Sequence, residues 1–64
     1  MTKSFKDIEG NVVRIDRDNM DIDTNAVQDV VSGKISSHEV NVDGRYYEVS
    51  EEVHDAVKEY VKYG

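Results

Sequence analysis

Residues 21–32 space their oxygen-bearing side chains like a calcium-binding loop. Positions 1, 3, 5 and 9 of an EF-hand loop carry carboxylates or an amide, namely Asp21, Asp23, Asn25 and Asp29. Position 6 requires a glycine and holds Ala26, and position 12 requires a bidentate carboxylate and holds Ser32. We therefore expect a solvated acidic turn here and no metal site.

The two histidines, His38 and His54, are the next candidates for chemistry. Neither has a second histidine at a ligand-like spacing, and the chain has no cysteine, which excludes a thiolate zinc site and a cysteine nucleophile. His38 stands between Ser37 and Glu39, but neighbours on a strand point to opposite faces and cannot form a catalytic relay. The glycines are isolated, so no phosphate-binding loop is present. The sequence predicts no enzyme and no cofactor.

The distribution of acidic residues is the more informative pattern. The chain has 14 Asp and Glu against 8 Lys and Arg, for a formal charge of −6. Four carboxylates lie within residues 16–23, and three more recur at helical spacing in the C-terminal segment, where each like pair costs roughly 0.2–0.5 kcal/mol. We interpret these seven as candidate partner-binding residues: Asp16, Asp18, Asp21, Asp23, Glu51, Asp55 and Glu59.

Net charge and hydropathy limit the partners. A negative chain is a poor ligand for nucleic acid, because affinity there comes from neutralising phosphates. The longest apolar runs are two residues, so we expect no membrane segment, and the N-terminus lacks the apolar stretch of a signal peptide. These features predict a cytoplasmic protein that binds a basic protein partner. An acidic surface that only maintains solubility would explain the same charge.

The spacing of the apolar residues, many of them valines, predicts the strands and the helix that must position these side chains. Residues 1–64 form one unit without repeats or linkers. Two apolar segments, residues 5–8 and 12–15, flank Glu9-Gly10-Asn11 and predict a hairpin. Asp43-Gly44 between residues 40–42 and 45–49 predicts a second hairpin with a type I′ turn. A helix is expected after Ser50, with Val53, Val57, Tyr60 and Val61 on its apolar face, Ala56 beside them and Gly64 as the stop.

Residues 24–33 fit two structures. Thr24 could cap a short helix that ends at Gly33, with Val27, Val30 and Val31 on one face. The same valine-rich run could be an edge strand. We favour the helix, which predicts an α+β fold of order ββαββα with a small antiparallel sheet of two hairpins. The alternative is a five-stranded sheet with one helix. Because so small a domain has a limited core, a homodimer or another partner would add stability.

The hairpin and helix of residues 40–53, in a short acidic chain without Cys or Pro, resemble the small early proteins of bacteriophages. Some of these proteins are DNA mimics that occupy the DNA site of a host protein, such as the nucleoid protein HU or RNA polymerase. The resemblance implies an inhibitor in the bacterial host cytoplasm with no catalytic residues. The alternative is a regulatory interaction module that binds its partner through an apolar or tyrosine patch, formed by exposed tyrosines, the open sheet edge or residues 27–31.

Overall fold

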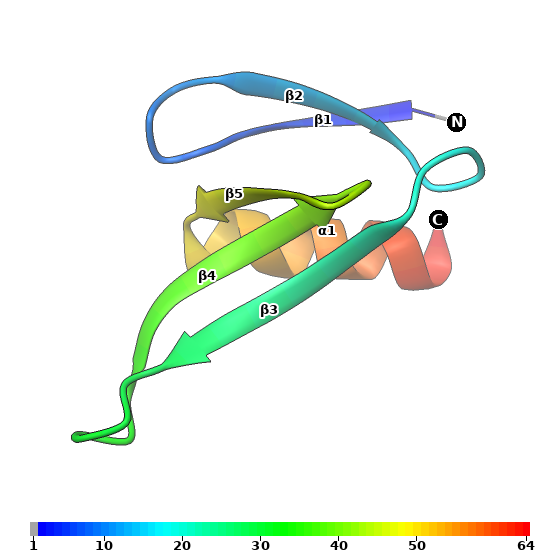
Figure 1. Ribbon diagram of the computed structural model, residues 1–64. Coiled ribbons are helices and arrows are strands. Elements are labelled where there is room, and N and C mark those ends of the chain that lie inside the picture. Colours follow the sequence, from blue (N-terminus) through cyan, green and yellow to red (C-terminus); the bar gives the residue numbers. More distant parts are fainter. Residues whose placement is uncertain (1) are drawn as a thin grey trace.

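The computed structural model describes residues 2–64, which form five strands and one helix (Figure 1). The elements follow in the order β1 (Thr2–Lys6), β2 (Val12–Asp16), β3 (Ile22–Gln28), β4 (Ile35–Val42), β5 (Arg45–Val49) and α1 (Glu51–Tyr63). Strands β1 and β2 form a separate antiparallel hairpin, and the other three form an antiparallel sheet of order β3-β4-β5. The α+β class is confirmed, and the ββαββα order is wrong.

Residues 24–33 account for that difference. They contain most of β3 and the turn that follows it, and they form no helix. Every residue of β3 pairs with β4, from Ile22 with Val42 to Gln28 with Ile35. The backbone hydrogen bonds of β3 to β4, its partner across the 29–34 turn, outweigh the weak local helix signal of a β-branched run. The alternative of five strands and one helix is therefore right in its elements, although the strands divide into two sheets.

Both predicted hairpins are present, although the first strand of the first hairpin is residues 2–6 where residues 5–8 were expected, so residues 7–11 form its turn. Asp43 and Gly44 have φ values of 51° and 88°, the positive values that both central positions of a type I′ turn require. In the first hairpin, the Asp7 carboxylate accepts hydrogen bonds from the backbone N–H groups of Glu9 and Asn11 at 2.9 and 2.8 Å. Local turn chemistry therefore determines where each of these strands reverses.

The C-terminal helix is also confirmed, with its capping. The Ser50 hydroxyl accepts a hydrogen bond from the Val53 N–H at 3.2 Å, and Gly64 ends the helix. Val57 and Tyr60 are buried as expected, whereas Val53 and Val61 are only partly buried and His54 is buried beside them. Ala56 is exposed.

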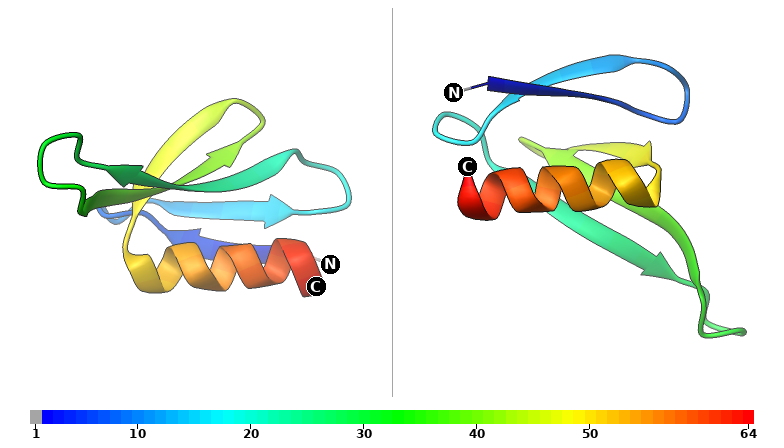
Figure 2. Two further views of the ribbon diagram at one scale, coloured as in Figure 1. Left: turned by 90° about the horizontal axis from the view of Figure 1, so that it is seen from below. Right: turned by 180° about the vertical axis from the view of Figure 1, so that it is seen from behind.

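The core lies where the hairpin, the three-stranded sheet and the helix meet (Figure 2). The helix covers one face of the sheet, and the β1–β2 hairpin closes the side next to β5, where the Ile8 N–H donates to the Glu48 carbonyl at 3.0 Å. The rings of Phe5 and Tyr47 meet edge to face across this junction, with centroids 5.9 Å apart. The buried apolar residues are Phe5, Ile15, Ile22, Val40, Val49, Val57 and Tyr60.

Beyond the core, β3 and β4 continue as a two-stranded arm that projects past the helix (Figures 1 and 2). Residues 25–36 of this arm are all exposed. Within residues 2–64, α1 is not long and apolar enough to cross a membrane.

Candidate acidic binding surface

One face of the three-stranded sheet is not covered by the helix, and we call it the open face. Strand alternation assigns it the residues between those that pack toward α1, since Ile22, Val40 and Val49 are buried on the other side. None of the residues on the open face is Lys or Arg. The open face consists of Asp23, Asn25 and Val27 from β3, Ser37, Glu39 and Asn41 from β4, and Tyr46 and Glu48 from β5.

The strand register brings three carboxylates together on this face. Glu39 pairs directly with Glu48, and its other neighbour is Asn25. Asp23 lies in the adjacent row, which continues through Asn41 to Tyr46. Like charges directly opposite one another destabilise a sheet, and within residues 2–64 no ion pair joins these three carboxylates to a basic side chain. The open face therefore concentrates negative charge at a cost in stability.

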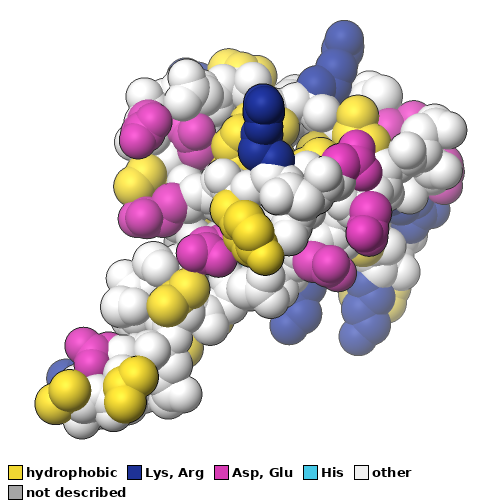
Figure 3. Space-filling model, in the orientation of Figure 1, with side chains coloured by type: hydrophobic (Ala, Val, Ile, Leu, Met, Phe, Trp, Pro, Cys, Tyr) yellow, Lys and Arg dark blue, Asp and Glu magenta, His cyan; other side chains and the backbone are white. Residues whose placement is uncertain are grey.

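Figure 3 views this side of the molecule and shows acidic side chains spread across it. One dark blue Lys or Arg side chain projects toward the viewer in the upper middle of the view, with acidic side chains on both sides of it, and the other dark blue side chains lie at the edges of the view and at the arm tip. Tyr46 is 63 % exposed, and its ring adds a large apolar contact surface beside the carboxylates. Exposed tyrosines are common anchors of protein interfaces.

The acidic segment 16–23 runs from the last residue of β2 through the connection of residues 17–21 into the start of β3. Asp16 is half-buried and organises the turn, because its carboxylate accepts hydrogen bonds from the Asp18 N–H at 3.0 Å and the Asn19 amide at 2.6 Å. These hydrogen bonds, the Asn19 amide first, hold the pKa of Asp16 below its usual 3.8. Of the predicted site residues, Asp16 therefore has a clear structural role.

This role predicts a pH-dependent effect of Asp16→Asn. A folded-state pKa below 3.8 means that the Asp16 carboxylate stabilises the fold above that pH and loses this contribution as pH falls through the folded-state value. We expect Asp16→Asn to lower the melting temperature at neutral pH and to differ less from wild type near pH 3, as measured by circular dichroism.

The matched control for this measurement is Asp23→Asn, because the Asp23 carboxylate accepts no hydrogen bond within residues 2–64. Its melting temperature should stay close to wild type at both pH values. An Asp16→Asn deficit that is the same at neutral and acidic pH would contradict the assigned hydrogen bonds.

The other acids of this connection are exposed. Asp21 approaches the β4–β5 turn, where its N–H donates to the Asp43 carboxylate and its carbonyl accepts from the Asp43 N–H, both at 2.8 Å. Arg17, the only base in the segment, turns toward the helix: its N–H donates to the Tyr60 hydroxyl and its guanidinium to the Tyr60 carbonyl. The positive charge is thereby directed to the negative end of the helix dipole.

The predicted helix acids Glu51, Asp55 and Glu59 are exposed along α1, on the opposite side of the sheet from the open face. Lys58 and Lys62 lie close to Asp55 and Glu59, and their positive charges weaken the negative field of the helix. The structure therefore does not bring the two predicted groups of carboxylates together. Asp23 joins the open face, and Asp18 and Asp21 lie in the connection that leads into β3.

The sequence interpretation missed Glu39 and Glu48. Their signal was present, because a two-residue turn at Asp43-Gly44 determines which residues pair across β4 and β5. No protein-family model, curated protein or solved structure matches the chain.

A second missed feature is the contact between the two histidines. The ring of His38 on β4 meets the ring of His54 on α1 edge to face, with centroids 4.9 Å apart. His54 is 8 % exposed, and its Nδ1 lies 3.0 Å from an Asp55 carboxylate oxygen. The pair helps to join the helix to the sheet. Within residues 2–64, no three metal-ligating side chains come together.

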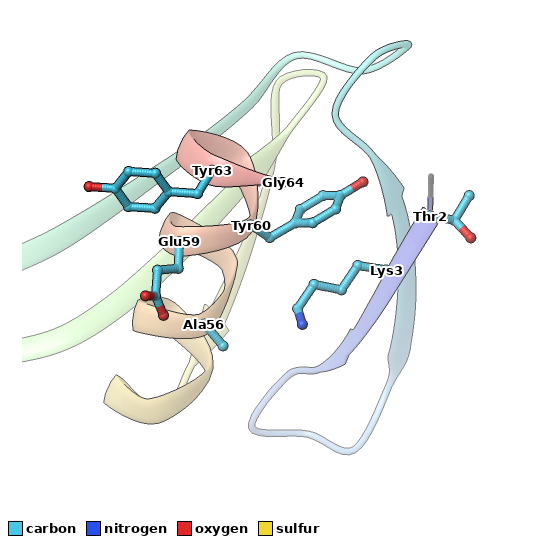
Figure 4. A pocket seen from close by; sticks show the side chains of 7 residues that line it. All are labelled: Thr2, Lys3, Ala56, Glu59, Tyr60, Tyr63 and Gly64. Atoms are coloured by element: carbon cyan, nitrogen blue, oxygen red, sulfur yellow. The ribbon is translucent and has the colours of Figure 1, made fainter.

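A pocket of about 420 Å³ lies between the C-terminal half of α1 and β1 (Figure 4). Lys3 extends from β1 toward the helix, and Tyr60 points from the helix toward β1, whereas Glu59 and Tyr63 project from the outer side of the helix. The ionisable groups are one amine and one carboxylate on long side chains, together with the two tyrosine hydroxyls. The pocket offers no arrangement of nucleophile, base and oxyanion donor.

Proposed function

We propose that the chain is an acidic binding protein whose open face docks onto the DNA-binding surface of a basic protein and excludes DNA. The observation that carries the proposal is the arrangement of three carboxylates on the open face, whose strand residues include no Lys or Arg. Glu39 is directly opposite Glu48, and Asp23 lies in the adjacent row of paired residues. Carboxylates held on a rigid sheet present a fixed pattern of negative charge, as the phosphates of DNA do.

The cost of this arrangement supports a binding role. Glu39 and Glu48 repel each other across β4 and β5, and a basic partner would relieve that repulsion in the complex. Tyr46 lies within the same face and would add apolar contact at the interface. A surface that served only solubility would gain nothing from pairing two glutamates directly.

In this proposal Asp23 lies within the docking surface, and the carboxylates of Asp18 and Asp21 lie at its margin. Asp18 and Asp21 would extend the negative field along the connection into β3, whereas Glu51, Asp55 and Glu59 face away from a partner on the open face. The setting that goes with this proposal is the bacterial cytoplasm, with a phage-encoded inhibitor acting on a host protein. Such a protein would need neither cofactor nor catalytic activity.

The test is displacement of DNA. Labelled duplex DNA is bound first to purified nucleoid protein HU, and in parallel to RNA polymerase, and the chain is then titrated in while fluorescence anisotropy is recorded. We expect release of DNA from at least one of the two, with an apparent affinity that falls tenfold or more between about 50 and about 200 mM salt.

Free labelled DNA titrated with the chain is the control and should show no change in anisotropy. The proposal is wrong if neither protein releases DNA and no DNA-binding protein from a bacterial lysate is retained on the immobilised chain at low salt. The measurement is repeated at different salt concentrations because salt screens the attraction between exposed charges, within about 8 Å at physiological ionic strength.

A second candidate function is an interaction module that binds through apolar contact. The observation that favours it is the arm tip, where Val30 and Val31 are 98 % and 96 % exposed. Binding through this tip would change little with salt and would be lost in Val30→Asp. The two candidates therefore differ in salt response and in the variant that abolishes binding.

A further inference from the structure

Strand β3 has a free edge. In the sheet order β3-β4-β5, β4 is central, and the outer edge of β5 is partly occupied by the Ile8 N–H, which donates to the Glu48 carbonyl. Within residues 2–64, no strand pairs with the outer edge of β3. An unpaired edge offers a row of backbone donors and acceptors to another strand.

This edge lacks the features that normally prevent pairing. Residues 22–28 contain one charged side chain, Asp23, and neither lysine nor proline. The register shift near Val27 places its extra residue, Ser36, on β4, where the Ser36 hydroxyl donates to the Val27 carbonyl. The irregularity therefore lies in β4, and β3 remains a continuous seven-residue strand.

The arm is also the part of the chain that two copies could bring together most easily. Residues 25–36 of the arm contain one acid, Asp29, and one base, Lys34, so this segment has no net charge in a chain of −6. Ala26 and Val27 are exposed on opposite faces of the arm, and Val30 and Val31 project at its tip. Repulsion is therefore smallest where apolar surface and free backbone coincide.

We propose that β3 pairs antiparallel with β3 of a second copy and joins two three-stranded sheets into one of six strands. The register that uses all seven residues of the strand centres on Asn25, so Ile22 lies opposite Gln28 and Asp23 opposite Val27 of the second copy. The two Asp23 side chains are then about 13 Å apart along the strands, beyond the screening length of about 8 Å.

The two-fold axis of this pairing is perpendicular to the sheet, so both open faces lie on the same side of the dimer. Their carboxylates form one continuous surface. The pairing itself depends on the β3 edge alone and stands whether or not the open face excludes DNA. Because seven strand residues bury less area than a standard interface of about 1,200–2,000 Å², we expect a weak dimer with a Kd on the order of 100 µM.

The experiment compares two substitutions at one residue by sedimentation equilibrium. Wild type should shift from 7.3 kDa toward twice that mass as concentration rises. Val27→Asp places a new carboxylate opposite Asp23 of the second copy, twice in each dimer, and should raise the Kd about tenfold. Val27→Lys places opposite charges in the same pairs and should leave the Kd unchanged or lower it.

Two further variants distinguish association in this strand register from non-specific apolar association. Asp23→Lys combined with Val27→Asp restores opposite charges and should recover the wild-type Kd. Val30→Asp lies outside the paired strand and should change the Kd less than Val27→Asp. Circular dichroism of the helix confirms folding of each variant, since Val27 is in the arm and outside the core.

Two results would overturn the proposal. A wild-type chain that stays monomeric to millimolar concentration excludes the pairing. Equal weakening by Val27→Asp and Val27→Lys would show that copies associate through the valine side chain without this strand register.

Discussion

Replacing the three open-face carboxylates, in the variant Asp23→Asn, Glu39→Gln and Glu48→Gln, is expected to weaken binding to the proposed basic partner at least tenfold at low salt. The reason is that all three lie on one rigid face and act on the partner together. The salt dependence should flatten as well, because fewer opposite charges meet in the complex. Both quantities come from the same DNA-displacement titration.

The fold should tolerate this variant and even gain stability. Glu39 and Glu48 are directly opposite, and removing one pair of like charges relieves roughly 0.2–1 kcal/mol of repulsion. We therefore expect a melting temperature equal to or above wild type together with weaker binding. That combination distinguishes a binding surface from residues that serve folding.

The matched control is Glu51→Gln, Asp55→Asn and Glu59→Gln, which removes the same number of charges from the helix side. Asparagine at position 55 retains an oxygen that can accept from His54. Binding should then change much less than in the open-face variant. Equal losses would mean that net charge, and no particular face, attracts the partner.

Ile15→Ala is expected to have the largest effect on stability, lowering the free energy of unfolding by about 2–5 kcal/mol. Ile15 is fully buried at 0 % exposure, where β2 packs into the shared core. A chain of this length has only roughly 3–10 kcal/mol in total, so a large fraction of the variant should be unfolded. Urea unfolding followed by circular dichroism measures the change.

Val12→Ala is the control for Ile15→Ala, because it also shortens a β-branched side chain of β2. Val12 is 67 % exposed, and its truncation should change the unfolding free energy by no more than about 0.5 kcal/mol. Equal effects of the two variants would contradict the placement of the hairpin against the sheet and helix.

Local chemistry in the sequence determined the turns and the helix. Asp43-Gly44 requires positive φ at both residues, Ser50 supplies a helix cap, and the valines of residues 53–61 follow helical spacing. Each of these signals acts within a few residues and needs no distant partner. They predicted the second hairpin, the helix and the α+β class correctly.

Only the tertiary structure decided the state of residues 24–33 and the composition of the candidate site. A valine-rich run has no strong local preference, and the hydrogen bonds of β3 to β4 decide it. The acids of 16–23 and of 51–59 were predicted to act on a partner together, but only Asp23 of the first group lies on the open face, and the helix lies on the opposite side of the sheet. Spacing along the chain specifies neighbours on one element, whereas packing between elements determines which faces remain exposed together.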